Sequence, residues 1–177
     1  MLLVMTSASF GQSHFNHAVT LTGRINPKET INAEGITMPV CNFEGLKPLL
    51  EQRDGKIYII NFWASWCKPC LEELPYFEKL AQSSHGELVI VLVSVDFRSK
   101  AESDLIPFIR KQQLKLPILL LDDPDANSWI EQVSPYWSGA IPATLIYRNE
   151  KKEFFEKKFT FEQLEAAVKD FYIEESN

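Results

Sequence analysis

Two continuous apolar runs dominate the hydrophobic pattern of the chain, one over residues 57–63 and the other over residues 88–95. Apolar residues at consecutive positions are typical of strands that are covered on both faces of a sheet. Between these runs, leucine and phenylalanine recur at three-residue intervals over residues 68–83, which predicts a helix with one apolar face. A strand, a helix and a strand of these lengths are expected to form a parallel βαβ unit.

The second half of the chain repeats this alternation and then changes to a hairpin. The elements expected there are a helix over 101–113, a short buried strand over 118–121, a short helix over 126–133, strands over 143–147 and 153–158 around a turn at 148–151, and a last helix. Thr160 begins that last helix, and Gln163 completes a capping box. A βαβ half followed by a ββα half predicts an α/β fold in which helices flank a mixed central sheet.

The N-terminal third is less regular. Residues 19–25 alternate between apolar and polar side chains, which predicts a strand with one solvent-facing side. Residues 28–45 are polar and contain Gly35 and Pro39, so we expect a loop-rich lead-in there. A short helix over residues 46–52 is expected to follow it.

Residues 1–11 are apolar and end in small side chains, as in the last part of a secretory signal peptide that is cleaved before Gln12. A basic start is missing, because the first lysine or arginine of the chain is Arg24. The segment is interpreted as a signal-peptide remnant, with a plain apolar terminus as the alternative. We therefore expect an exported protein, in the periplasm or on the exterior of the cell envelope, and a cytoplasmic location stays open. No other segment has the roughly 18 apolar residues that a membrane span requires.

The composition fits a single folded domain. The chain has 177 residues, of which 45% are hydrophobic, so it can form an ordinary core and wholesale disorder is excluded. Acidic side chains number 24 against 18 basic ones, which gives a formal net charge of −6. Such a charge offers no electrostatic attraction for nucleic acid or for an anionic membrane surface, and no nucleic-acid partner is expected.

The chemistry of the chain is expected at Cys67 and Cys70, which form a Cys-x-x-Cys motif directly after the first buried strand and at the start of the following helix. A helix N-terminus presents unpaired backbone N–H groups and the positive end of the helix dipole, and both favour a thiolate over a thiol. Lys68 adds a nearby positive charge. Cys67 is therefore the candidate attacking sulfur, and Cys70, one helical turn further in, is the candidate resolving sulfur that closes the 67–70 disulfide.

A zinc site is one alternative for this cysteine pair. Structural zinc requires four ligands, so two more residues would have to join the cysteines. The remaining candidate ligands are Cys41, His14, His17 and His85, which do not repeat a paired spacing. A plain structural disulfide is a second alternative, although surface disulfides do not usually lie between a buried strand and a helix. Cys41 itself is expected to be a buried apolar side chain, and a redox role for it stays open. We expect no metal and no cofactor.

The segment from Asn61 to Phe77, with the sequence NFWASWCKPCLEELPYF, resembles the active-site segment of the thioredoxin superfamily, and more narrowly that of TlpA-like and ResA-like thiol–disulfide oxidoreductases. The resemblance extends more loosely over residues 36–172. It implies a thioredoxin-like fold with an N-terminal strand extension and a βα insertion. On this basis the chain is divided into the signal-peptide remnant over 1–11, an N-terminal extension over 12–35 and a thioredoxin-like domain over 36–173.

The same resemblance implies a cis-proline that faces the cysteines, and Pro142 in the segment 139–144 matches it. An X-Pro bond adopts the cis form at a cost of only about 0.5–1 kcal/mol, and an ordinary trans proline is the alternative. The exposed backbone of Ile141 is then expected to pair with an extended substrate. The expected substrate-binding set is completed by Trp66, Lys68 and Pro69, whereas Trp63, Tyr136 and Trp137 are expected to pack in the core.

Asn61 occupies the position at which thioredoxin itself has a buried aspartate that assists proton transfer at the resolving cysteine. Because an asparagine side chain does not titrate, that role has to fall elsewhere. Glu73 lies three residues after Cys70 on the same helix face, as in ResA-like proteins, and is the candidate proton acceptor. Glu72 points nearly opposite. The alternative is that Glu73 is only a favourable acid in the first turn of the helix.

These features predict an enzyme, a thiol–disulfide oxidoreductase that exchanges electrons with protein disulfides through Cys67 and Cys70 and acts as a reductant in an oxidising compartment. The expected partners are protein disulfides and dithiols, with a membrane electron donor as a further candidate, and the chain is expected to be a monomer. A thioredoxin-like Cu(I) metallochaperone is the alternative, although no histidine lies close to the motif in sequence. A peroxiredoxin is not expected, because the Thr-x-x-Cys arrangement of its peroxidatic cysteine is absent.

Overall fold

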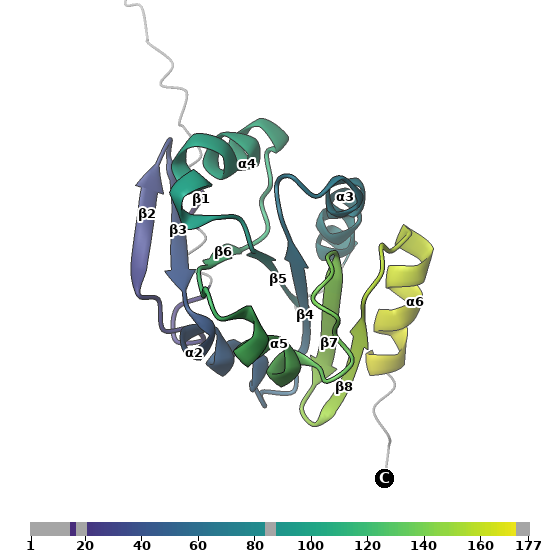
Figure 1. Cartoon of the computed structure of the whole chain (residues 1–177). Helices are drawn as coiled ribbons and strands as arrows, with labels where there is room; N and C mark the ends of the chain where they lie inside the picture. The colour runs from purple at the N-terminus through teal and green to yellow at the C-terminus, as the bar shows by residue number, and fades with distance from the viewer. Residues whose placement is uncertain (1–14, 17–20, 84–87, 173–177) are drawn as a thin grey trace, which may run out of the picture.

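The computed structural model describes residues 15–16, 21–83 and 88–172. Over these residues the chain forms one eight-stranded sheet with helices on both faces (Figure 1). Neighbouring strands are parallel in one part of the sheet and antiparallel in another, so the expected α/β fold with a mixed sheet is confirmed. Within the described ranges, no helix is both long and apolar enough to cross a bilayer.

The elements follow the predicted alternation from β4 onward. The strands are β1 (Phe15–Asn16), β2 (Glu29–Ala33), β3 (Ile36–Cys41), β4 (Ile57–Trp63), β5 (Leu88–Ser94), β6 (Ile118–Leu121), β7 (Ala143–Arg148) and β8 (Lys151–Phe155). The α-helices are α2 (Phe43–Leu46), α3 (Lys68–Ser83), α4 (Ile106–Gln112), α5 (Ala126–Val133) and α6 (Phe161–Tyr172). Shorter helical turns are a 3-10 turn at Lys47–Leu50, another at Arg98–Lys100, and a π-helical turn at Ala101–Leu105 that runs into α4.

The sheet has the strand order β1-β3-β6-β5-β4-β7-β8, and β2 pairs with β3. β4 and β5 are parallel along their whole length, from the pair Ile57 and Leu88 to the pair Trp63 and Ser94, with α3 between them in sequence. The predicted parallel βαβ unit is therefore confirmed. β7 runs antiparallel to β4 and to β8, so the C-terminal hairpin makes the sheet mixed.

The sheet separates two hydrophobic cores, and β4 contributes to both. Ile57, Ile59 and Trp63 pack in the core under α3, α4 and α6, whereas the alternate residues Tyr58 and Ile60 pack in the core under α2 and α5. This alternation follows from the two-residue repeat of a strand. A polar residue at position 61 must therefore face α3, and this direction positions the site described below.

The N-terminal part differs from the prediction. The prediction of a strand over 19–25 is wrong for residues 21–25, since residues 21–24 form a turn, and residues 19–20 lie outside the described residues. The loop-rich lead-in expected over 28–45 is also wrong, because β2 and β3 form an antiparallel hairpin there. Glu34 and Gly35 both have positive φ, 51° and 80°, as the two-residue hairpin turn with matching twist requires. A glycine that was expected to interrupt regular structure therefore joins two strands.

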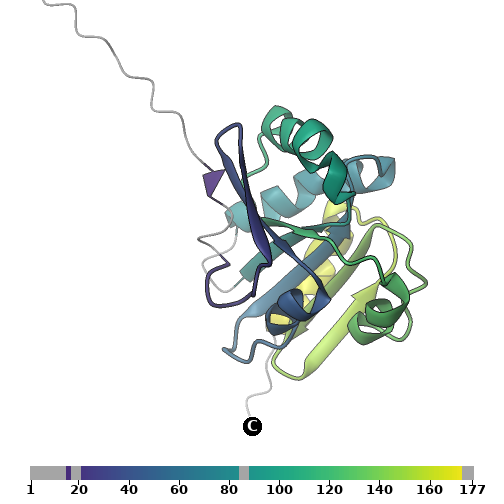
Figure 2. The same cartoon turned by 60° about the vertical axis from the view of Figure 1, so that its left-hand side comes forward.

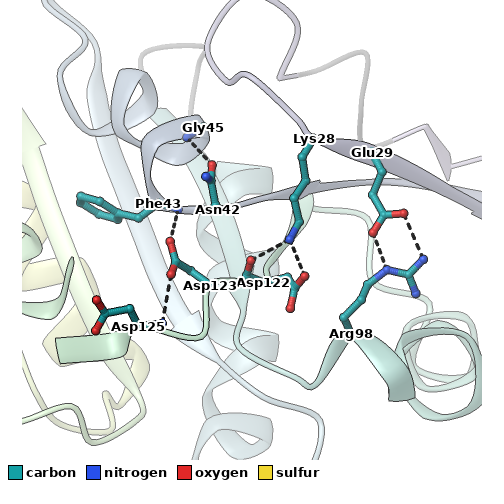
Figure 3. Close-up of polar contacts among 9 residues, drawn as sticks. All are labelled: Lys28, Glu29, Asn42, Phe43, Gly45, Arg98, Asp122, Asp123 and Asp125. Atoms are coloured by element: carbon teal, nitrogen blue, oxygen red, sulfur yellow. Dashed lines mark hydrogen bonds and ion pairs between the residues drawn. The ribbon is translucent and has the colours of Figure 1, made fainter. Parts of the chain in front are cut away.

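This hairpin extends the sheet beyond β6, as the predicted N-terminal strand extension requires, although it begins later in the chain than expected (Figure 2). Polar contacts hold it to the loops that follow β5 and β6 (Figure 3). Lys28 Nζ donates to the carbonyl oxygen of Asp122 at 3.0 Å and also meets its carboxylate, and Arg98 Nε donates to Glu29 at 2.6 Å. The carboxylate of Asp123 accepts from the N–H of Phe43 at 3.0 Å, which fixes the start of α2.

The remaining predictions hold with small shifts of the boundaries. The helices over 68–83 and 126–133 and the strands over 57–63 and 118–121 match their predicted residues. Thr160 and Gln163 form the predicted capping box before α6. The N–H of Thr160 donates to Gln163 Oε1 at 3.1 Å, and the N–H of Gln163 donates to Thr160 Oγ1 at 3.3 Å.

Candidate active site

Cys67 and Cys70 lie at the point where the chain leaves β4 and enters α3. β4 ends at Trp63, Cys67 directly precedes the first residue of α3, and the two cysteines are joined in a disulfide with their Cα atoms 5.3 Å apart. Cys70 is fully buried, whereas 6% of Cys67 is exposed. The sulfur of Cys67 is therefore the one that an incoming partner reaches first.

The backbone of α3 points a donor at the sulfur of Cys67. The N–H of Cys70 is directed at Cys67 Sγ over 3.4 Å, and the N–H of Leu71 bonds to the carbonyl oxygen of Cys67 at 3.1 Å. In the reduced protein the N–H of Cys70 and the helix dipole stabilise a negative charge on the sulfur of Cys67. This geometry favours Cys67 as the thiolate.

The loop before Cys67 is fixed by a carboxylate that the sequence analysis missed. Asp96 is nearly fully buried and accepts hydrogen bonds from the N–H of Ser65 at 2.9 Å and from its hydroxyl at 2.6 Å. The hydroxyl of Ser94 donates to the same carboxylate at 2.8 Å. Because β4 and β5 are parallel, the residues that follow both strands meet at one sheet edge. An acidic residue directly after the second buried run was therefore the available signal.

The Ile141–Pro142 peptide bond is cis, and this turn faces the cysteine pair. Cys67 Sγ lies 3.7 Å from the carbonyl oxygen of Ile141, although the two residues are 74 positions apart. Pro142 is buried and Ile141 is partly exposed. Trp137 Nε1 donates to the carbonyl oxygen of Ala140 at 2.8 Å, which holds the segment that leads into the turn. The structure thus brings Cys67, Ile141 and Pro142 together.

Glu73 is fully buried on α3, three residues after Cys70. Its Oε1 accepts from Asn61 Nδ2 at 2.9 Å, and its Oε2 accepts from the N–H of Phe159 at 2.8 Å. Burial raises the pKa of Glu73 to about 7, against the opposing effect of both hydrogen bonds and of the positive charge of Lys158. A carboxyl group with this pKa exchanges a proton readily at neutral pH.

Asn61 is thus a neighbour of Glu73 whose importance the sequence analysis missed. Its Nδ2 also donates to the hydroxyl oxygen of Thr144 at 3.1 Å, and both side chains are fully buried. Asn61 on β4 is paired with Thr144 on the antiparallel strand β7, and Thr144 lies two residues after Pro142. The contact depends on this strand register, which no sequence pattern specified.

The outer rim of the site is aromatic and basic. Trp66 is 62% exposed beside Cys67, and Lys68 and Pro69 are also exposed. Trp137 is buried against Phe62, with ring centroids 4.6 Å apart, so its expected packing in the core is confirmed. Trp63 is fully buried as well. The same expectation is wrong for Tyr136, which is 87% exposed because it stands in a turn before the buried tryptophan.

Cys41 is separated from the cysteine pair by the sheet. It is fully buried in the core under α2 and α5, whereas Cys67 and Cys70 belong to the core under α3. Burial raises the pKa of the Cys41 thiol to about 11. The histidines considered as zinc ligands, His14, His17 and His85, lie outside the described residues. Within the described part of the chain, no group of three or more histidine, cysteine, aspartate or glutamate residues is placed to hold a metal ion.

The chain is similar to several proteins that carry the name thiol–disulfide oxidoreductase. The model of the AhpC/TSA family matches residues 29–152. Over 147 residues the chain is 30% identical to sporulation thiol-disulfide oxidoreductase A of Bacillus subtilis, which covers 80% of this chain and 76% of that protein. Over 143 residues it is 29% identical to the thiol-disulfide oxidoreductase ResA of Bacillus cereus, which covers 80% of this chain and 78% of that protein.

Two further likenesses are more restricted. A segment of 76 residues is 38% identical to the thioredoxin-like protein YneN of Bacillus subtilis, but it spans only 43% of this chain and 45% of that protein. Among solved structures, a thioredoxin-related protein from Neisseria meningitidis serogroup B superposes with a TM-score of 0.60 over 71% of this chain and 91% of that one. The sequence identity in that superposition is 19%, so it shows the thioredoxin-like fold alone.

Proposed function

Because this chain belongs to the AhpC/TSA family of thioredoxin-like proteins, and is a TlpA/ResA-like member of the thioredoxin superfamily, we propose that it is a thiol–disulfide oxidoreductase that reduces protein disulfides. The observation that carries the proposal is the Cys67–Cys70 disulfide at the N-terminus of α3, with Cys67 Sγ 3.7 Å from the carbonyl oxygen of Ile141 beside the cis-proline.

The first step is the attack of the Cys67 thiolate on one sulfur of a substrate disulfide. A bond forms between Cys67 and that sulfur, the substrate disulfide breaks, and the other substrate sulfur leaves as a thiolate that takes a proton from solvent. The N–H groups at the start of α3 stabilise the thiolate before the attack. The product of this step is a mixed disulfide between the protein and its substrate.

The second step is the attack of Cys70 on Cys67 Sγ. Glu73 accepts the proton of the Cys70 thiol, the Cys67–Cys70 bond forms, and the substrate leaves with its second sulfur as a thiolate that is then protonated. Two electrons have moved from the protein to the substrate, and the protein is left in the disulfide state of the structure. The burial of Glu73 and its pKa of about 7 support this role.

Substrate binding is assigned to the surface around Cys67. An extended substrate segment pairs with the backbone of Ile141 next to Pro142, in the manner of an added β-strand. Trp66, Lys68 and Pro69 form the exposed rim against which the neighbouring substrate residues pack. The proposal includes an exported protein that acts in an oxidising compartment and is reduced again by a membrane electron donor. The apolar residues 1–11, which lie outside the described residues, support the export.

The test is reduction of the disulfides of insulin with dithiothreitol as the electron source. We expect Cys67→Ser to remove the catalysed rate, by more than about 10³-fold, since the nucleophile is lost. Cys70→Ser should instead trap the mixed disulfide, which mass spectrometry detects as a covalent adduct at Cys67. Cys41→Ser is the matched control and should retain the rate. Reduction by Cys67→Ser at the wild-type rate would overturn the proposal, and a Cu(I) competition titration on the same proteins tests the metallochaperone alternative.

A further inference from the structure

Glu73 is surrounded by hydrogen-bond donors on both of its oxygens. Asn61 Nδ2 donates to Oε1 and the N–H of Phe159 donates to Oε2. This arrangement suits the ionised carboxylate, which only accepts, and neither of these two groups, as it is oriented in the structure, accepts from the O–H of the neutral acid. The O–H of the neutral acid gains a hydrogen bond here if one of the two donors gives way and presents an acceptor.

The two donors differ in what they can do. The N–H of Phe159 is part of the backbone and remains a donor in every state. The amide of Asn61 carries a donor on one side and an acceptor on the other, and half a rotation about its terminal bond exchanges them. The proton is therefore expected on Oε1, the oxygen that faces Asn61, and Oε2 keeps its bond from Phe159.

The surroundings of Asn61 allow both orientations. In the observed one, both amide hydrogens have acceptors, at Glu73 Oε1 and at Thr144 Oγ1, while Asn61 Oδ1 is buried and has no partner within the described ranges. In the reversed one, Oδ1 accepts from the protonated Glu73 and from the Thr144 hydroxyl, and Nδ2 becomes the unpartnered end. A hydroxyl serves either orientation, because it donates and accepts equally well. Each orientation leaves one end of the amide unpaired, so the protonation of Glu73 decides between them.

We propose that Asn61 is a positioning residue whose side-chain amide reverses when Glu73 takes up a proton, donating to the carboxylate and accepting from the carboxyl group. The reversal itself does not depend on the proposed function, but its role rests on that function: it stabilises on Oε1 the proton that Glu73 takes from Cys70. The asparagine thereby couples proton transfer at the resolving cysteine to β7, the strand that begins next to Pro142.

Among the described residues, few other charged or titratable groups lie near enough to Glu73 to affect its protonation. On α3 itself, Glu72 points to solvent and pairs with Lys158 at 2.6 Å. Lys158, from the segment before α6, is the charged group that acts on Glu73 in the described part of the chain, and it lowers the pKa of that carboxyl. Asn61 on β4 and Thr144 on β7 carry no charge. In the oxidised protein the reversal of the amide can therefore be followed through the titration of Glu73 itself.

The experiment uses the full chain in its oxidised state, in which neither Cys67 nor Cys70 titrates. NMR of protein labelled with ¹³C-glutamate and ¹⁵N-asparagine follows the Glu73 carboxyl and the Asn61 side-chain NH₂ over pH. We expect both signals to change with one common midpoint, near pH 7. Asn61 amide signals that stay constant through the titration of Glu73 would overturn the proposal, and this result needs no variant.

Variants then separate positioning from packing. Asn61→Leu removes both amide functions and keeps the branched shape of the side chain. Because the lost bond to the ionised carboxylate is stronger than the lost bond to the neutral acid, we expect the midpoint of Glu73 to rise by about one pH unit or less, at most about a tenfold gain in proton affinity. Thr144→Val should shift it less, and Thr144→Ser, which keeps the hydroxyl, should restore the wild-type value. A rise well above one unit would contradict the proposal, because it would show that the amide stabilises the ionised carboxylate alone and gives the neutral carboxyl group no bond. These titrations involve no substrate, so their outcome is independent of the insulin assay that tests the proposed function.

Discussion

Glu72 and Glu73 are adjacent in sequence and lie in opposite environments. Glu72 is exposed on the outer face of α3, where its ion pair with Lys158 at 2.6 Å lowers its pKa. Glu73 is fully buried on the inner face, where burial raises its pKa to about 7. Successive helical residues are about 100° apart, so one position decides between solvent and core. The difference teaches that location, and not residue type, gives a carboxyl group a pKa that suits proton transfer.

The same division runs through the whole site. On its inner face α3 buries Cys70 and Glu73 together with Leu74, Phe77 and Leu80. Its outer and leading surface carries the exposed residues Lys68 and Pro69. In the proposed mechanism the substrate meets the outer surface, whereas the proton moves on the inner one. The two faces can therefore be changed one at a time.

Replacing each carboxylate by its amide is expected to give the largest contrast. Glu73→Gln removes the proton acceptor of Cys70, and we expect the release of the mixed disulfide to slow by about 10²-fold at neutral pH. Glu72→Gln, the matched control one residue away, should keep the wild-type rate. Rapid-quench kinetics with a disulfide peptide measures both. Equal rates in the two variants would show that the buried carboxyl group takes no part in the resolving step.

The free energy of unfolding should depend on pH through Glu73, the carboxyl group on the inner face. The pKa of Glu73 is raised above the ordinary value of 4.5 that it has in the unfolded chain, so the folded state binds more protons between about pH 4.5 and pH 7. Its contribution is most favourable below pH 4.5 and is lost as the pH rises to 7, a loss of about 3 kcal/mol. Urea unfolding of the oxidised protein at pH 5 and pH 8 should show most of this loss, and Glu73→Gln should abolish it.

Much of this site can be predicted from the periodicity of helices and strands. The helical repeat predicts that Glu73 shares a helix face with Cys70 and that Glu72 does not. The position of Cys67 directly after a buried strand and before a helix predicts that it is the attacking sulfur. The pairing and register of the strands cannot be predicted from periodicity. Asn61 reaches Thr144 because β7 runs antiparallel to β4 in one particular register. Asp96 reaches Ser65 for the corresponding reason in the parallel pair.

The N-terminal error has a different physical origin. Gly35 and Pro39 favour a loop when only the sequence is considered, whereas in the structure Gly35 supplies the positive φ of a two-residue hairpin turn. Pro39 lies within β3 opposite Thr30, so a strand accommodates it here. Glycine and proline mark both loops and tight turns between strands, and only the flanking strand pairing separates the two cases.

Lys158 connects the two faces and gives the smallest expected effect. It pairs with Glu72 on the outside, and its charge also lowers the pKa of the buried Glu73. Lys158→Met should therefore return the pKa of Glu72 towards its ordinary value and raise that of Glu73 by less than about half a unit, because the charge is exposed and screened by solvent. Carboxyl NMR at low ionic strength measures both shifts. If the pKa of Glu73 moved more than that of Glu72, the charge of Lys158 would act mainly on the core, and the separation of the inner and outer faces of α3 would fail.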